Sequence, residues 1–133
     1  MGLKLQTNVE LIRATYEGAP ADNAKHLAAL FTPETCWTEA AGFPYAGTFV
    51  GIDAVTHNVF ERLSSEWSDY NASAEHFVSE GEDVVVLGVY SGTYRKTGRF
   101  MEARFAHHWT LNEGKVVSFQ QYVDSQKVWQ AIE

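Results

Sequence analysis

The sequence FAHHWTLNEGKVVSFQQYVD, residues 105–124, decides the fold of this chain. Two runs of mixed apolar and aromatic residues flank a glycine-containing turn at 112–115, which is the pattern of a β-hairpin. Two further turn signals, at 81–83 and 96–99, divide the chain from Trp67 onward into four strands. The second half is therefore predicted to be an antiparallel meander.

The first half of the chain carries a helical period instead. Apolar residues recur every three to four positions in three segments, and each is predicted to be a helix. These segments are 5–16, 27–31 and 52–63. A short strand is expected at 35–41, an irregular loop with apolar anchors at 42–51, and a closing helix at 125–132. The order of elements predicts an α+β fold, with helices packed on one face of a curved, mainly antiparallel sheet that encloses a pocket.

Length and composition fit one globular domain spanning residues 1–133. Seventeen acidic residues against ten basic ones give a formal net charge of -7, which disfavours nucleic acid and anionic membranes as partners. No apolar stretch is long enough for a signal peptide or membrane span, and the single Cys36 excludes an internal disulfide, so a cytoplasmic location is expected. Phosphate-cradling glycine loops and nucleotide fingerprints are absent, and no cofactor is expected.

The expected strand pairing predicts which side chains face the pocket. Symmetric pairing about the last turn places His107 opposite Gln120. Symmetric pairing of the preceding hairpin places Gly88 opposite His107, where the missing side chain would leave room for a ligand. One sheet face then carries an aromatic row with a few polar groups. Its members are Tyr90, Tyr94, Phe105, His107, Trp109, Gln120, Tyr122 and Asp124.

The opposite face of the same sheet is predicted to be too apolar for open solvent. It carries Val85, Leu87, Val89, Ala106, Val117, Phe119 and Val123, with Glu102, Arg104, His108 and Gln121 among them. A chain of this length can cover only one sheet face with helices, so the other face requires a partner. A second copy related by a twofold axis is the simplest partner, and a homodimer through this outer face is expected.

Three residues are candidates for proton transfer. Asp124 could be a general base whose pKa is raised beside aromatic walls, or it could cap the final helix. His107 has an ordinary pKa suited to neutral-pH chemistry, or it could be a buried histidine that hydrogen-bonds Gln120 or Tyr122. Glu39 could supply a second carboxylate or pair with His107, or it could be a surface charge on an edge strand.

Aromatic side chains are expected to line the pocket, where phenols could donate to a carbonyl or enolate oxygen; the alternative for each is core packing. The candidates are Tyr16, Trp37, Tyr45, Tyr90 and Tyr122, with Phe105 and Trp109 from the aromatic row. His107 and His108 are adjacent and face opposite ways on a strand, so they cannot chelate one ion, and no metal site is expected. Cys36 lacks a neighbouring base and is expected to be a buried, inert thiol.

Short motifs follow one another in a fixed order along the chain. They are Trp37-Thr38-Glu39, Ser91-Gly92-Thr93 with Thr97-Gly98, Phe105-Ala106-His107-His108-Trp109, Gly114-Lys115 and Phe119-Gln120-Gln121-Tyr122-Val123-Asp124. Their order and spacing resemble the SnoaL-like branch of the nuclear transport factor 2 superfamily, over nearly the whole chain. The resemblance implies a cone-shaped fold, with His107 and Asp124 lining a cavity between sheet and helices.

The resemblance leaves the reaction open, because the superfamily includes isomerases, aldol cyclases, epoxide hydrolases, dehydratases and binding or assembly domains. The tyrosine, neutral carboxylic acid and aspartate base of ketosteroid isomerase have no secure match in this sequence. The Asp, Arg, Asp arrangement of the epoxide hydrolases is disfavoured, since Arg104 is predicted to point away from the pocket.

Two functions are consistent with the sequence. The first is a cofactor-free isomerase, cyclase or dehydratase acting on a small, mostly apolar carbonyl compound. In it His107 and Asp124 would exchange acid and base roles while Tyr122 positions the oxygen. The second is a non-catalytic dimeric domain that only binds such a ligand. A protein-binding adaptor is a third possibility, for which the sequence shows no docking surface beyond the dimer face.

Overall fold

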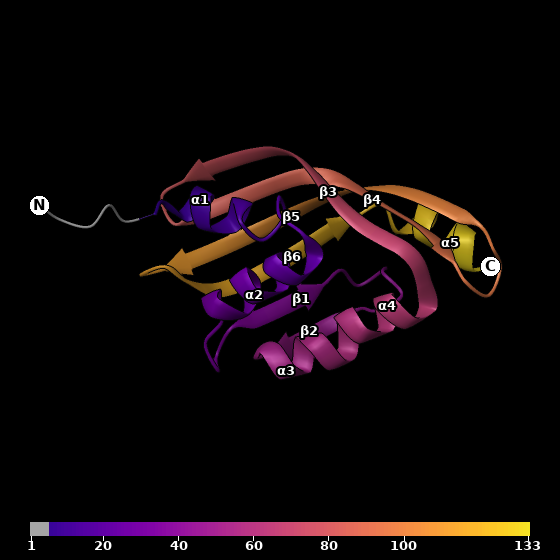
Figure 1. Cartoon of the computed structure of the whole chain (residues 1–133), viewed down its shortest axis with the longest axis horizontal. Coiled ribbons are helices and arrows are strands. Elements are labelled where there is room, and N and C mark those ends of the chain that lie inside the picture. The colour runs from indigo at the N-terminus through magenta and orange to yellow at the C-terminus, as the bar shows by residue number, and fades with distance from the viewer. Residues whose placement is uncertain (1–5) are drawn as a thin grey trace, which may run out of the picture.

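A computed structural model describes residues 6–133 and contains one six-stranded sheet with helices against it (Figure 1). The strands are β1 (Cys36–Glu39), β2 (Gly47–Val50), β3 (Trp67–Glu80), β4 (Asp83–Tyr94), β5 (Phe100–Asn112) and β6 (Lys115–Val123). The helices are α1 (Asn8–Arg13), α2 (Pro20–Leu30), α3 (Ile52–Val55), the π-helix η1 (Thr56–Phe60), α4 (Glu61–Glu66) and α5 (Ser125–Ile132). The strand order is β2-β1-β6-β5-β4-β3, and only the β1–β6 pair is parallel among the described strands. The predicted α+β fold with a mainly antiparallel sheet is confirmed.

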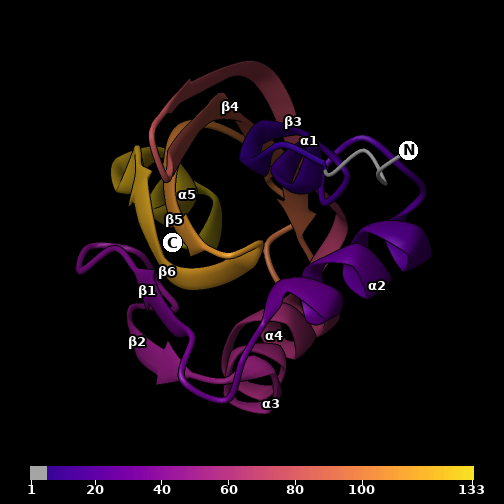
Figure 2. The ribbon, with the colours of Figure 1, turned by 90° about the vertical axis from the view of Figure 1, so that its left-hand side faces the viewer.

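The sheet is strongly curved, and α1, α2 and α4 lie on its concave side (Figure 2). Helix α5 closes one end of the molecule, where Thr97 Oγ1 donates to the Ala131 carbonyl at 2.5 Å. Its apolar residues Val128 and Ala131 are buried. None of the helices within residues 6–133 is long and apolar enough to cross a membrane.

The first two predicted helices are present with other bounds: α1 is shorter than the predicted 5–16, and α2 starts seven residues before the predicted 27–31. Helix α1 starts with a capping box, in which Thr7 and Glu10 satisfy each other's backbone N–H groups. Leu5, part of the predicted first helix, lies outside the described residues. Helix α2 starts at Pro20, which suits the first helical position because its missing N–H would have no partner there.

The predicted third helix is one continuous helical run from 52 to 66 with a π-helical segment in its middle. The wider turn of η1 accommodates one extra residue per turn, and Val55 and Val59 are both fully buried beside it. Leu63 follows on α4 and faces the space between helix and sheet.

The segment 42–51 was predicted to be an irregular loop, and that prediction is wrong in part. It contains strand β2, which pairs antiparallel with β1 through Trp37 opposite Phe49. The expected apolar anchors are present, since Phe43 and Tyr45 are buried. Because β2 covers the outer edge of β1, Glu39 does not lie on an edge strand.

The β5–β6 pairing starts in the predicted register and then shifts by one residue. Leu111 pairs with Val116 as expected, but Thr110 pairs with Ser118, which leaves Val117 as an extra residue. Such a bulge turns every following side chain to the other face. His107 therefore lies opposite Gln121 rather than the predicted Gln120.

The β4–β5 pairing is offset by two residues from the prediction, which preserves the faces. Gly88 pairs with Phe105 instead of His107. A Cβ on Gly88 would lie 2.2 Å from the Ser73 carbonyl oxygen and 2.5 Å from Cζ of Phe105. The space that was predicted to admit a ligand beside the imidazole is thus occupied by the Phe105 ring.

Candidate functional site

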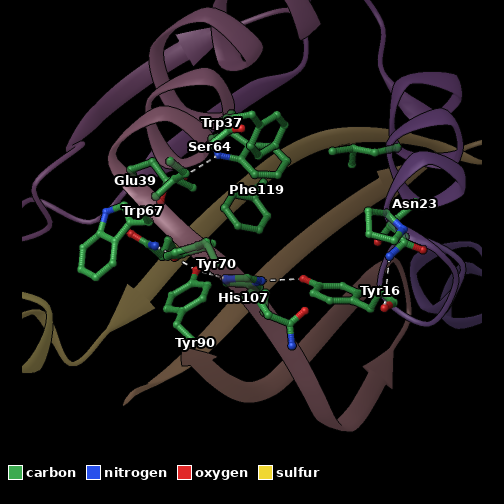
Figure 3. A pocket seen from close by; sticks show the side chains of 18 of the residues that line it. Tyr16, Asn23, Trp37, Glu39, Ser64, Trp67, Tyr70, Tyr90, His107 and Phe119 are labelled. Atoms are coloured by element: carbon green, nitrogen blue, oxygen red, sulfur yellow. Dashed lines mark hydrogen bonds between the residues drawn. The ribbon is translucent and has the colours of Figure 1, made fainter. Parts of the chain in front are cut away.

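A cavity of about 570 Å³ lies between the concave face of the sheet and helices α2 and α4. This volume is in the usual range for a small-molecule site. Phe, Tyr and Trp side chains form much of its wall, and its polar groups come from the segment after α1, from α2 and α4, and from β1, β3, β4, β5 and β6. The close view in Figure 3 shows Tyr16 and Tyr90 pointing toward His107 from opposite sides.

His107, on β5, is held between two phenols. Its Nδ1 lies 2.5 Å from the Tyr16 hydroxyl, which follows α1, and its Nε2 hydrogen-bonds the Tyr90 hydroxyl on β4 (Figure 3). The Phe105 ring stacks on the imidazole with centroids 4.0 Å apart. The imidazole is only 5% exposed, so its two nitrogens depend on these phenols for hydrogen bonds.

Each phenol is itself held by a fixed donor. Trp109 Nε1 donates to the Tyr16 oxygen at 3.1 Å, and Gln121 Nε2 donates to the Tyr90 oxygen at 2.9 Å. The Gln121 amide is oriented by the backbone N–H of Ala40, which donates to its Oε1 at 3.0 Å. Strands β4, β5 and β6 and the segment after α1 therefore position one continuous polar chain.

Burial keeps this chain electrically neutral. Desolvation lowers the pKa of His107 to about 3, because no described carboxylate contacts the ring to stabilise its charged form. Desolvation likewise raises the pKa of Tyr16 and of Tyr90 well above the ordinary value for a phenol. The imidazole is thus neutral and both phenols are protonated at physiological pH.

Glu39 is the one carboxyl group buried in this site among the described residues. The alternation of β1 turns it to the same face as Trp37, whose Nε1 donates to Glu39 Oε1 at 3.0 Å. Glu39 Oε2 is buried without a hydrogen-bond partner, and the residue is 5% exposed. Burial raises the pKa of Glu39 to about 7, an effect that the Trp37 hydrogen bond only partly offsets. The alternative of a surface charge is therefore wrong for Glu39.

The apolar walls of the cavity are built from aromatic rings that pack against one another. Trp37 stacks on Phe119 with ring centroids 3.7 Å apart and meets the edges of Phe60 and Trp109 at 5.6 and 5.5 Å. Phe43 stacks toward Tyr90 from the segment between β1 and β2. Stacked and edge-on aromatic side chains of this kind favour planar apolar molecules.

One phenol in the cavity was missed by the sequence analysis. Tyr70, on β3, contacts the rings of Tyr90 and Trp67 and lines the cavity, but its hydroxyl has no hydrogen-bond partner in the described structure. A register shift between Ser68 and Asn71 turns it inward, with the intervening Asp69 at a positive φ of 54°. A bulge without glycine leaves no sequence signal, so no pattern could have placed Tyr70.

The structure brings together six of the predicted site residues and leaves five elsewhere. Those that line the cavity are His107, Glu39, Tyr16, Trp37, Tyr90 and Trp109. Phe105 lies behind His107 as its stacking partner, and Tyr45 is buried below Trp67, whose Nε1 donates to its hydroxyl at 2.9 Å. Both were predicted to line the pocket, and both support it instead.

The other three predicted residues were placed wrongly because of the bulge in β6. Tyr122 is 57% exposed on the outer face, and Gln120 shares that face, while Phe119 and Gln121 turn inward. Asp124 is the N-cap residue just before α5, on the outside of the sheet, and its side chain makes no capping hydrogen bond. The acid-base pair of His107 and Asp124 is therefore not assembled in this cavity.

Two further predictions concern side chains outside the cavity. Cys36 is exposed, so the buried thiol that was predicted is wrong. Arg104 points outward as predicted, and its Nη1 lies 3.0 Å from Glu75 Oε1. His108 also points outward, where its Nε2 lies 2.9 Å from Asp83 Oδ1, so the two adjacent histidines do face opposite ways.

Comparison with known proteins agrees with the fold. Residues 12–119 match the SnoaL-like domain family. An NTF2-like protein from Burkholderia thailandensis has 37% identity, with 97% of this chain and 99% of that chain covered and a TM-score of 0.92. An NTF2-like protein of unknown function from Burkholderia pseudomallei has 24% identity, coverage of 96% and 98%, and a TM-score of 0.84.

A third similar structure carries a ligand in its name. TerC, co-crystallised with polyporic acid, has 22% identity, with 94% of this chain and 97% of that chain covered and a TM-score of 0.82. At this identity the likeness shows the fold alone. No curated protein matches the chain. The family match over most of the sequence and the 37% identical structure establish that this chain belongs to the SnoaL-like family of the nuclear transport factor 2 superfamily.

Proposed function

We propose that this protein is a cofactor-free enzyme that moves a proton on a small, mostly apolar carbonyl compound. The observation that carries the proposal is the buried Glu39 carboxyl, with one oxygen unpartnered, in an aromatic cavity beside hydroxyl donors. A pKa of about 7 means that this group exists in both protonation states at neutral pH, as a general base requires.

The roles of the remaining groups follow from their charge. Carboxylate Glu39 would take a proton from the carbon beside the carbonyl, and the electron pair would move onto the carbonyl oxygen. A phenol of the cavity would donate to that oxygen and stabilise its negative charge. The protonated carboxyl would then return the proton to another carbon of the same molecule, which is an isomerisation. In a ring closure it would give the proton to the alkoxide oxygen formed when the enolate carbon bonds to a second carbonyl, and in an elimination to the hydroxyl group that leaves as water. His107 is neutral at this pH and therefore does not act as a general acid.

Hydrogen exchange tests the proton transfer without requiring the natural substrate. We expect the protein to speed exchange of the hydrogens beside the carbonyl of 2-tetralone in D2O, followed by NMR. Glu39→Gln should lower the enzymatic rate by at least about 100-fold, because proton transfer to a positioned base contributes on that scale. The rate should also rise with pH through about 7, as Glu39 ionises.

A matched control separates the base from its surroundings. Glu66→Gln changes another carboxylate, which accepts from Tyr45 on the outer side of that ring, and should leave the exchange rate within a few fold. If 2-tetralone or a related ketone shifts the melting temperature but is not exchanged, the enzyme hypothesis fails. The alternative, a non-catalytic ligand-binding domain, would then stand. Asp124 does not line the cavity. A binding domain is therefore favoured over an enzyme that uses His107 and Asp124 as its acid-base pair.

The proposal includes a homodimer through the outer sheet face. Leu87 and Val117 are 40% and 47% exposed there, beside the half-covered Tyr122. We expect the wild type to have twice the monomer mass by light scattering and Leu87→Lys to be a folded monomer. Lys25→Glu, on α2 at the opposite side of the molecule, should stay dimeric. A monomeric wild type would contradict this part of the proposal. The cytoplasmic location stays a prediction from the sequence.

A further inference from the structure

The polar chain Tyr16–His107–Tyr90 contains more hydrogens than its contacts can use. A neutral imidazole carries one N–H, and each phenol carries one O–H. These three hydrogens serve two contacts, Tyr16 to Nδ1 and Tyr90 to Nε2. One hydrogen is therefore always left over.

The leftover hydrogen cannot belong to the groups that anchor the chain. The backbone N–H of Ala40 fixes Gln121 with its amide oxygen toward β1, so that its NH₂ group donates to Tyr90. The indole of Trp109 can only donate, and it donates to Tyr16. Each phenol oxygen thus already accepts one fixed hydrogen bond and retains one further lone pair.

The imidazole tautomer then decides which phenol is the free donor. With the proton on Nε2, His107 donates to Tyr90, Tyr16 donates to Nδ1, and the Tyr90 hydrogen is left over. With the proton on Nδ1, His107 donates to Tyr16, Tyr90 donates to Nε2, and the Tyr16 hydrogen is left over. Both phenols line the cavity, and neither hydroxyl has another acceptor in the described structure.

We infer that Tyr16, His107 and Tyr90 form a coupled donor that gives one phenol hydrogen bond to a ligand oxygen, from either tyrosine but not from both at once. His107 is its positioning residue. The inference rests on the proposed small-molecule site and narrows its ligands to uncharged planar ketones with one acceptor oxygen. A buried hydroxyl without an acceptor is unfavourable, and a ketone oxygen supplies that acceptor.

Coupling makes a specific prediction for a double-mutant cycle. In Tyr16→Phe, the Tyr90 hydroxyl can still donate to the ligand while the imidazole donates to Tyr90. In Tyr90→Phe, the Tyr16 hydroxyl can donate to the ligand in the same way. We expect each single variant to bind 1-tetralone within about threefold of the wild type, and the double variant about 30-fold more weakly, by titration of tryptophan fluorescence. Tetralin, which has the same rings without the oxygen, should bind all four proteins within about threefold.

Two results would overturn the coupled donor. Losses of similar size in both single variants that add in the double variant would indicate two independent donors. No binding of 1-tetralone by the folded wild type would exclude a ketone site. Circular dichroism and melting curves of the variants distinguish misfolding from lost binding. The variants are expected to fold, because phenylalanine retains the ring.

A measurement that needs no variant tests the same inference. The ¹⁵N NMR signals of His107 should show one protonated and one unprotonated nitrogen from pH 5 to 8, and 1-tetralone should change their populations. An imidazolium signal near pH 6, with both nitrogens protonated, would contradict the hydrogen count. Turnover enters neither experiment. Failed hydrogen exchange with an intact cycle would thus reject the enzyme and keep the coupled donor.

Discussion

Acidification from pH 7.5 to 3 is expected to lower the free energy of unfolding of the wild type by about 4 kcal/mol more than that of His107→Gln. His107 is buried between two phenols and the Phe105 ring, and this desolvation lowers its pKa from 6.5 to about 3. In the unfolded chain the same imidazole binds a proton below about pH 6.5. Glutamine carries no such proton in either state.

The sign follows from proton binding. Between pH 6.5 and 3 the unfolded state holds a proton on His107 that the folded state does not, so the free energy of unfolding falls as the pH falls. The contribution is fully present above 6.5. Urea titrations at half-unit steps should show this difference in slope between wild type and variant.

An exposed histidine provides the control for this experiment. His76→Gln, on β3, should follow the wild-type curve at every pH, because its side chain is exposed in the folded protein. Parallel curves for wild type and His107→Gln would mean that the imidazole is protonated in the folded state. The coupled donor would then lose its basis as well.

Glu39→Gln is expected to stabilise the protein progressively as the pH rises, by about 3 kcal/mol between pH 4 and 8.5. Burial beside Trp37 raises the pKa of Glu39 from 4.5 to about 7, while the glutamine oxygen can still accept from the indole. Within this window the folded wild type retains a proton that the unfolded chain has released. Stability is therefore full below pH 4.5 and is lost as the pH rises through about 7.

The comparison of variant and wild type across this window isolates the ionisation from any effect of packing. Glu80→Gln, at the exposed end of β3, should show no such divergence. Thermal melts at pH 4, 6 and 8.5 suffice. A constant difference between wild type and Glu39→Gln would show that the carboxyl ionises normally, and would remove the basis for a base with a pKa near 7.

These two effects oppose one another between pH 4.5 and 6.5, where falling pH favours the protonated Glu39 and disfavours the neutral His107. Burial thus favours the protonated form of Glu39 and the unprotonated form of His107. Only Glu39 changes state near neutral pH, and this is why it, rather than the histidine, is assigned the proton transfer.

The sequence by itself determined the features that depend on local periodicity. The four long strands lie between the three turns that were predicted, and α5 spans 125–132 as expected. The alternation within β1 placed Trp37 and Glu39 on one inward face, and the alternation within β5 placed His107 inward and His108 outward. These predictions hold because the period of two is a property of each strand, whatever it pairs with.

Tertiary structure alone decided how the strands meet. Val117 is an extra residue in β6 and reverses the faces of the residues that follow it. Phe119 and Gln121 therefore face the cavity in place of the predicted Gln120 and Tyr122, and Asp124 lies outside it. A bulge on β3 turned Tyr70 inward in the same way. A one-residue bulge changes local energy little, but it is selected by the packing of residues far apart in the chain, and a sequence pattern does not record that packing.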